Sequence, residues 1–136
     1  MSTVEDRLAD LLVEQGVRLL ETDMLHPRFN AVFHNASRAI IVRSDLDPVT
    51  RVCAIAHELG HAVNNDSCSS PRAERLADEW AAQSIIDHSI VEDVAQDCGG
   101  APSAIAAELG ITPHLLSVWM QLYEAGRINT YDCAIY

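Results

Sequence analysis

The sequence predicts a single α+β domain in which a small, mainly antiparallel sheet is followed by helices. Three short segments rich in β-branched and aromatic residues lie between residues 17 and 44, which indicates strands. Apolar residues recur at helical spacing before residue 16 and again from residue 47 onward. A chain of 136 residues, of which 49% are hydrophobic, can bury one core. We therefore expect residues 1–136 to form one domain.

The first helix is predicted close to the N-terminus. Its apolar residues are spaced three or four positions apart, or directly adjacent, at Val4, Leu8, Leu11 and Leu12. Ser2 and Glu5 have the spacing of a capping box, and Gly16 is a stop signal. Strands are then expected within residues 17–22, 29–34 and 39–44. The segment Asn-Ala-Ser between the last two suits a tight connection.

The remaining helices are predicted from their start signals. A capping residue followed by proline, a favoured helix start, occurs at Asp47 and Pro48, at Ser70 and Pro71, and at Thr112 and Pro113. Ser89 and Glu92 have the spacing of another capping box. The last two helices are separated by Gly110 and form a tail that resembles a helix-turn-helix.

Charge and cysteine content narrow the class of protein. All nine basic residues are arginine, and the formal net charge is −11, which opposes binding to nucleic acid or anionic membranes. The N-terminal segment lacks the apolar run of a signal peptide or membrane span, and we expect a cytoplasmic protein. No C-x-x-C pair is present. Buried free thiols are expected at Cys53, Cys68, Cys98 and Cys133.

The segment HELGH, residues 57–61, predicts a zinc site. On a helix, His57 and His61 stand one turn apart and differ by about 40° in direction, so one ion can contact both. Tetrahedral zinc then needs a third protein ligand and, for catalysis, a water molecule. Glu58 points about 100° away from His57. It therefore suits a general base beside the metal.

The third ligand is expected on the helix that begins at Pro71. Glu74 and Asp78 lie one turn apart, in line with Ala81 and Ile85. A carboxylate that faces packed protein is costly unless it is paired or binds metal. We therefore assign Glu74 as the ligand and Asp78 as the acceptor for a ring N–H of a ligating histidine.

Other candidates fit this role less well. Glu79 is expected to be a surface residue, within reach of Arg75 one turn earlier. Cys53 lies two helical turns, about 12 Å, from His61, too far for a shared ion. Asp66 follows in a loop and stays open as an alternative ligand.

HELGH at residues 57–61 and ERLADEWAA at residues 74–82 together resemble the ImmA/IrrE family of metallopeptidases. The family pattern is H-E-x-x-H followed by E-x-x-A-[ND]-x-[FW]-A-A. The resemblance implies a zincin-like fold with one Zn²⁺ held by His57, His61 and Glu74, and Glu58 as the base. It also implies a soluble gluzincin-type endopeptidase that cleaves a helix-turn-helix transcriptional repressor. After this match, residues 83–90 read QSIIDHSI where family members often have an L-L-M-P-like run.

Substrate binding and oxyanion stabilisation are less defined by the sequence. Residues 39–44 are expected at the sheet edge beside the site, where a protein substrate would bind in extended form. A developing oxyanion usually needs a further donor. Four residues are candidates for the donor to the oxyanion, although a structural role is expected for each of them: His88, His114, Tyr123 and Tyr131.

Two other classes of function stay open. The helix-turn-helix-like tail would suit a DNA-binding regulator. From Leu76 to the C-terminus, however, nine residues are acidic and only Arg127 is basic, which opposes phosphate contacts. A non-catalytic metal-binding interaction module would have no use for Glu58 as a base. We therefore expect a zinc peptidase with a protein substrate and no direct contact with nucleic acid or membrane.

Overall fold

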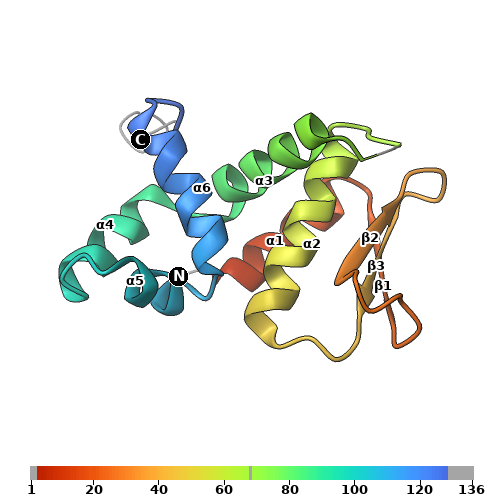
Figure 1. Cartoon of the computed structure of the whole chain (residues 1–136), viewed down its shortest axis with the longest axis horizontal. Coiled ribbons are helices and arrows are strands. Elements are labelled where there is room, and N and C mark those ends of the chain that lie inside the picture. Colours follow the sequence, from red (N-terminus) through yellow and green to blue (C-terminus); the bar gives the residue numbers. More distant parts are fainter. Residues whose placement is uncertain (1–2, 68, 129–136) are drawn as a thin grey trace.

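The structure is a computed structural model that describes residues 3–67 and 69–128. Its elements are α1 (Val4–Glu14), β1 (Arg18–Thr22), β2 (Ala31–His34), β3 (Ala39–Arg43), α2 (Pro48–Val63), α3 (Pro71–Ile85), α4 (His88–Asp97), α5 (Pro102–Leu109) and α6 (Pro113–Glu124). The sheet lies at one end of the molecule and α4 and α5 at the other, with α1, α2 and α3 between them (Figure 1). The predicted α+β fold is confirmed.

The sheet is mixed, with β3 in the middle between β1 and β2. β1 runs parallel to β3, whereas β2 is antiparallel to it, so the prediction of a mainly antiparallel sheet is wrong. The cause is the connection between β1 and β2, which crosses the end of β3 and leaves the middle position for that strand. Arg43 holds this crossing by donating to the carbonyl oxygens of His26 and Phe29, at 2.8 and 2.6 Å.

Three of the predicted helix starts are confirmed. At each of them the side chain of the capping residue accepts a hydrogen bond from the backbone N–H three residues further on; these capping residues are Asp47, Ser70 and Thr112. The capping box of α1 is formed by Thr3 and Asp6, one residue after the predicted pair, whose Ser2 lies outside the described residues. Asp87 caps α4 in place of the predicted Ser89, because its carboxylate accepts the Ser89 N–H.

α2 and α3 form the centre of the fold and approach each other closely at Gly60. A Cβ atom at this position would lie 2.6 Å from the carbonyl oxygen of Ala77, so the approach requires glycine. The buried face of α2 carries Val52, Ile55, Ala56 and Leu59, which belong to the same core as Ile40 and Val42 of β3. The glycine contact thus sets the distance between the facing sides of α2 and α3.

α6 packs on α3 through an apolar face that consists of Leu115, Leu116, Trp119 and Leu122. After α6 the chain returns over α3, where Arg127 pairs with Glu79 at 2.9 Å. The prediction that Glu79 is a surface residue is therefore wrong, because its side chain is only 15% exposed. In residues 3–67 and 69–128, every helix is too short or too polar to span a bilayer.

Candidate metal centre

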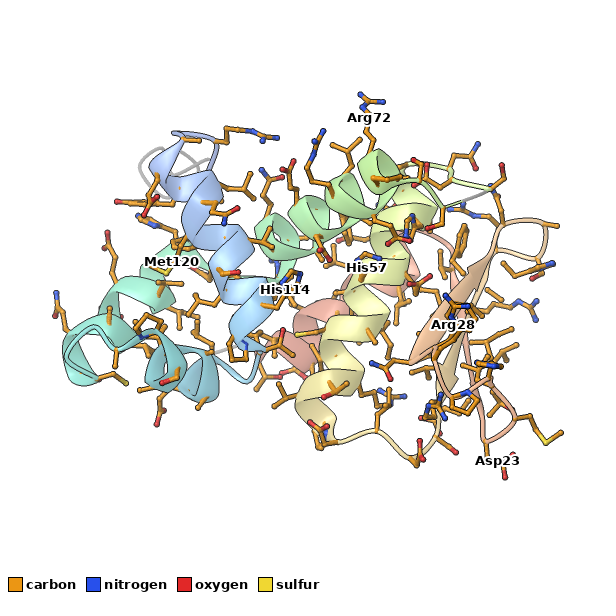
Figure 2. All side chains as sticks on the ribbon, viewed as in Figure 1. Asp23, Arg28, His57, Arg72, His114 and Met120 are labelled. Atoms are coloured by element: carbon orange, nitrogen blue, oxygen red, sulfur yellow. The ribbon has the colours of Figure 1, made fainter. Side chains whose placement is uncertain are left out.

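α2 presents His57, Glu58 and His61 at one place, as their spacing predicts. The two imidazole rings lie 4.9 Å apart between centroids and are nearly perpendicular. Potential ligand atoms of the three residues all lie within 4.8 Å of one another. His61 is buried and His57 is largely covered. Figure 2 shows His57 on α2, near α3.

α3 brings Glu74 to both histidines. Its Oε2 atom lies 2.5 Å from Nε2 of His57 and 3.1 Å from Nε2 of His61. The other carboxylate oxygen accepts a hydrogen bond from the hydroxyl of Ser69. Burial would raise the pKa of Glu74, but hydrogen bonds from Ser69 and His57 lower it. Glu74 is therefore an anion whose oxygen faces both ring nitrogens.

Asp78, one turn further along α3, holds the opposite side of the His57 ring. Its Oδ1 atom lies 2.6 Å from Nδ1 of His57, so the Nδ1–H donates to the carboxylate and Nε2 faces Glu74. Burial alone would lower the pKa of His57, but the bond to Asp78 raises it to about 9. The carboxylates around this ring therefore favour positive charge there, whether a ring proton or a bound cation.

Asp66 has the same relation to His61 that Asp78 has to His57. Its Oδ2 atom lies 2.9 Å from Nδ1 of His61, and its own N–H donates to the carbonyl of His61. The side-chain amide of Asn35, in the hairpin between β2 and β3, donates to the carbonyls of Asn65 and Asp66, each at 3.3 Å. From the sequence, Asp66 was expected only as an alternative metal ligand. Its role as the acceptor for His61 was not predicted, because Asn35, which holds the Asp66 loop, lies far away in the chain.

Glu58 stands beside the histidines and not between them. Its nearest oxygen is 3.9 Å from Nε2 of His57, and its side chain is 16% exposed. Burial raises the pKa of Glu58, with opposing effects from His57, His61 and the backbone N–H of Phe33. The carboxylate therefore faces both the histidines and strand β2.

The cleft at the site, about 250 Å³ in volume, is bordered by β2. Its walls are formed by Phe29, Ala31, Val32, Phe33, Glu58, His61, Asp66, Ser67, Ser69 and Glu74. The expectation that residues 39–44 form the sheet edge here is wrong, because β3 is the middle strand. Arg43 donates to the carbonyl of Asn30 across the β2–β3 pair. By antiparallel alternation, the backbone groups of Ala31 and Phe33 face the open edge.

The other candidate donors occupy different surroundings. The rings of His88 and Tyr123 lie 5.4 Å apart and stack with Trp119. His114 contacts the site through Asp78, with 2.9 Å between Nε2 and Oδ2. Tyr131 lies outside the described residues, as do two of the predicted free thiols, Cys68 and Cys133. The thiols of Cys53 and Cys98 are free, as predicted, but they are only half-buried.

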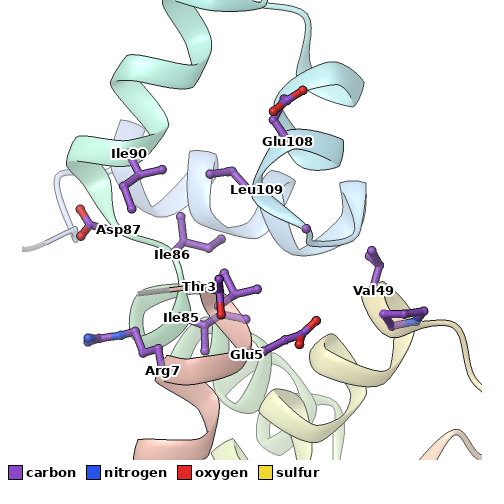
Figure 3. A pocket seen from close by; sticks show the side chains of 13 residues that line it. Thr3, Glu5, Arg7, Val49, Ile85, Ile86, Asp87, Ile90, Glu108 and Leu109 are labelled. Atoms are coloured by element: carbon purple, nitrogen blue, oxygen red, sulfur yellow. The ribbon is translucent and has the colours of Figure 1, made fainter. Parts of the chain in front are cut away.

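A larger cavity, of about 600 Å³, lies at the beginnings of α1 and α2 and beside α4 and α5 (Figure 3). Its lining includes Ile86, Asp87 and Ile90, from the segment in which the sequence departs from the family pattern. None of the residues that gather around His57 and His61 lines it. Of these two cavities, the smaller cleft is the one lined by the clustered side chains, among them His61 and Glu74.

The gathered side chains fit a zinc ion. Two imidazole nitrogens and a carboxylate oxygen are a common zinc ligand set, and zinc bonds of about 2.0–2.1 Å place tetrahedral ligand atoms about 3.3 Å apart. The separations of 2.5 and 3.1 Å from Glu74 reach that value after a small outward shift of its carboxylate. The surrounding acidic side chains, Glu58, Asp66 and Asp78, add negative charge that favours a cation.

Comparison with known proteins identifies a family. The family model described as Peptidase_M78, IrrE N-terminal-like domain, matches residues 14–117, which is more than half of the 136 residues. The match includes the helix with HELGH and the helix with Glu74 and Asp78. No match is found among curated proteins or among solved structures.

Proposed function

Because the chain belongs to the Peptidase_M78 family, a family of peptidases, we propose that it is a zinc-dependent metallo-endopeptidase that cleaves a helix-turn-helix transcriptional repressor. One observation carries the proposal: His57 and His61 direct their Nε2 atoms at the same oxygen of Glu74. A cluster of this kind, next to an open strand edge, suits hydrolysis of an extended polypeptide.

We assign one zinc ion to His57, His61 and Glu74. Glu58 also offers an oxygen near the histidines, but Glu74 is the better ligand because its oxygen contacts both Nε2 atoms and the nearest oxygen of Glu58 is 3.9 Å away from His57. Asp78 and Asp66 accept the Nδ1–H groups and so orient the rings. A zinc ion held there would polarise the scissile carbonyl and make water more acidic.

Glu58 is assigned to the proton transfers. Its carboxylate stands beside the two histidines, where it can reach the attacking water without occupying a ligand position. It would accept a proton from the attacking water and deliver it to the nitrogen of the breaking amide bond.

The substrate is proposed to lie along β2. The backbone groups of Ala31 and the carbonyl of Phe33 at the open edge can pair with an extended chain regardless of its side chains, whereas the Phe33 N–H is directed at Glu58. A folded partner offers such a segment only in an exposed loop or linker. Selectivity for one partner would therefore depend on contacts outside the strand pairing.

The partner is proposed to be a repressor encoded nearby, met in the cytoplasm. The resemblance of HELGH and ERLADEWAA to the ImmA/IrrE family supports this choice. The net charge of −11 also favours a partner with a basic DNA-binding surface over DNA itself. No direct contact with nucleic acid or membrane is required.

The test is to mix the purified chain with the purified repressor, with zinc and with a chelator. We expect cleavage of the repressor at one or a few sites, its loss with chelator, and weak digestion of casein. Brisk digestion of casein with an intact repressor would instead indicate a general peptidase. No cleavage of either protein by the zinc-loaded chain would contradict the proposal and favour a non-catalytic module.

A further inference from the structure

His114 belongs to the C-terminal helices but forms a hydrogen bond with Asp78, a residue of the metal centre. It is the second residue of α6, and its Nε2 lies 2.9 Å from Oδ2 of Asp78. The side chain is 69% exposed, so water is available as an alternative partner and burial does not force the contact. Figure 2 shows His114 at the start of α6 and His57 on α2.

Asp78 is held between two imidazoles. Oδ1 accepts from Nδ1–H of His57 at 2.6 Å, and Oδ2 accepts from Nε2–H of His114 at 2.9 Å. Rotation of the carboxylate would break both hydrogen bonds. His114 therefore restricts the carboxylate that orients the His57 ring.

A hydrogen bond also joins the turn before α6 to α2. The backbone N–H of Thr112 donates to Sγ of Cys53 at 3.3 Å, one helical turn before His57. Burial raises the pKa of the Cys53 thiol, so the sulfur is an uncharged acceptor. The start of α6 is thus tied to α2 through Cys53 and to α3 through Asp78.

His61 offers a comparison within the same site. Its acceptor, Asp66, lies in a loop, and the side-chain amide of Asn35 in the hairpin donates to the backbone carbonyl of Asp66. Asp78 lies within a helix, where its backbone is fixed but its carboxylate can still rotate. A second side-chain donor to the Asp78 carboxylate restricts this rotation, and His114 is that donor.

We propose that His114 is a positioning residue of the metal centre, which acts through Asp78 to hold His57 with Nε2 directed at the metal. This inference rests on the proposed function, because it assumes that His57 binds zinc. Under it, the start of the second helix of the helix-turn-helix-like tail is part of the zinc site.

The experiment measures zinc affinity of the full chain by competition with a chromophoric chelator. Loss of an outer hydrogen-bond partner weakens metal binding about 10- to 100-fold. We expect Asp78→Ala to fall in that range and His114→Ala to weaken binding up to about tenfold. His114→Gln retains an N–H donor and should keep most of the affinity. Gln121→Ala, at an exposed position two turns further along α6, is the matched control and should bind as the wild type does.

A double-mutant cycle separates positioning from a general structural effect. In the Asp78→Ala background, His114→Ala should have no further effect on zinc affinity, whereas a structural role would give additive losses. Wild-type affinity in His114→Ala, or full additivity in the cycle, would overturn the inference while leaving the proposed function intact. A wild-type chain that binds no zinc would overturn both. Urea unfolding of the zinc-free variants checks that each one folds.

Discussion

Replacing Gly60 by alanine should separate α2 from α3 and weaken zinc binding more than it weakens the fold. The new Cβ would lie 2.6 Å from the Ala77 carbonyl oxygen and 2.8 Å from its Cα. Ordinary contact begins at 3.4 Å, so the helices must move apart by about 0.8 Å. Overpacking of this kind costs about 1–3 kcal/mol, and the higher helix propensity of alanine returns about 1 kcal/mol. The net loss of stability is therefore about 0–2 kcal/mol.

The effect on the metal should be larger because Glu74 lies on α3 and the histidines on α2. Metal–ligand distances tolerate about 0.2 Å, well below the displacement that Gly60→Ala imposes. We expect zinc affinity to fall at least tenfold, the lower end of the effect of losing an outer hydrogen-bond partner. Chelator competition measures the affinity, and urea unfolding of the zinc-free protein measures the stability.

A second substitution tests the cause. The atoms that the new Cβ meets are backbone atoms of Ala77, so Ala77→Gly should not restore zinc affinity to the Gly60→Ala variant. Rescue by Ala77→Gly would mean that side-chain crowding, and not the backbone approach, is responsible. Unchanged zinc affinity in Gly60→Ala itself would refute the conclusion that this approach sets the position of Glu74.

Three further predictions concern single residues. Glu58→Gln should keep zinc but lower the cleavage rate about 10²- to 10⁴-fold; equal rates would remove Glu58 from the chemistry. Glu74→Ala should lose zinc by metal analysis while Glu79→Ala, which breaks only the pair with Arg127, keeps it; the reverse result would make our ligand assignment wrong. Hydrogen bonds from Thr50 hold the pKa of Asp47 below its ordinary 3.8, so this N-cap stabilises the fold above that pH and loses its effect as pH falls through the lowered value. Asp47→Asn, which also caps helices, should show a smaller loss of stability between neutral and acid pH in urea titrations; an unchanged pH profile would contradict the role of this carboxylate.

Features that depend on neighbouring residues were predictable from the sequence. The caps at Asp47, Ser70 and Thr112 follow from hydrogen bonds within one helical turn. The shared direction of Glu74 and Asp78 follows from their spacing on one helix. These local rules were enough to bring the two carboxylates to the histidines, although the expectation that Glu74 faces packed protein is wrong, because its side chain is 44% exposed.

Features that depend on distant parts of the chain were not predictable. The middle position of β3 depends on the path of residues 23–30 over the sheet. The role of Asp66 depends on Asn35 in a hairpin, and the covering of Glu79 depends on Arg127, 48 residues later. Periodicity reports which side of a helix a residue occupies, but not which segment will cover that side.

The shortness of β2 has a consequence for when a partner would be cut. This strand has only four residues, and two of them turn their backbone groups to the open edge. Each hydrogen bond gained there contributes a net of about 0.5–1.5 kcal/mol, whereas opening a structured segment of a stable domain costs up to about 5–15 kcal/mol. On the proposed mode of binding, the edge would not pull a folded segment open and would instead capture one that has opened by itself. The rate of cutting would follow the local unfolding equilibrium of the partner. Each change of about 1.4 kcal/mol in the free energy of local unfolding would change that rate tenfold. A single mutation or the loss of a ligand makes a difference of about this size.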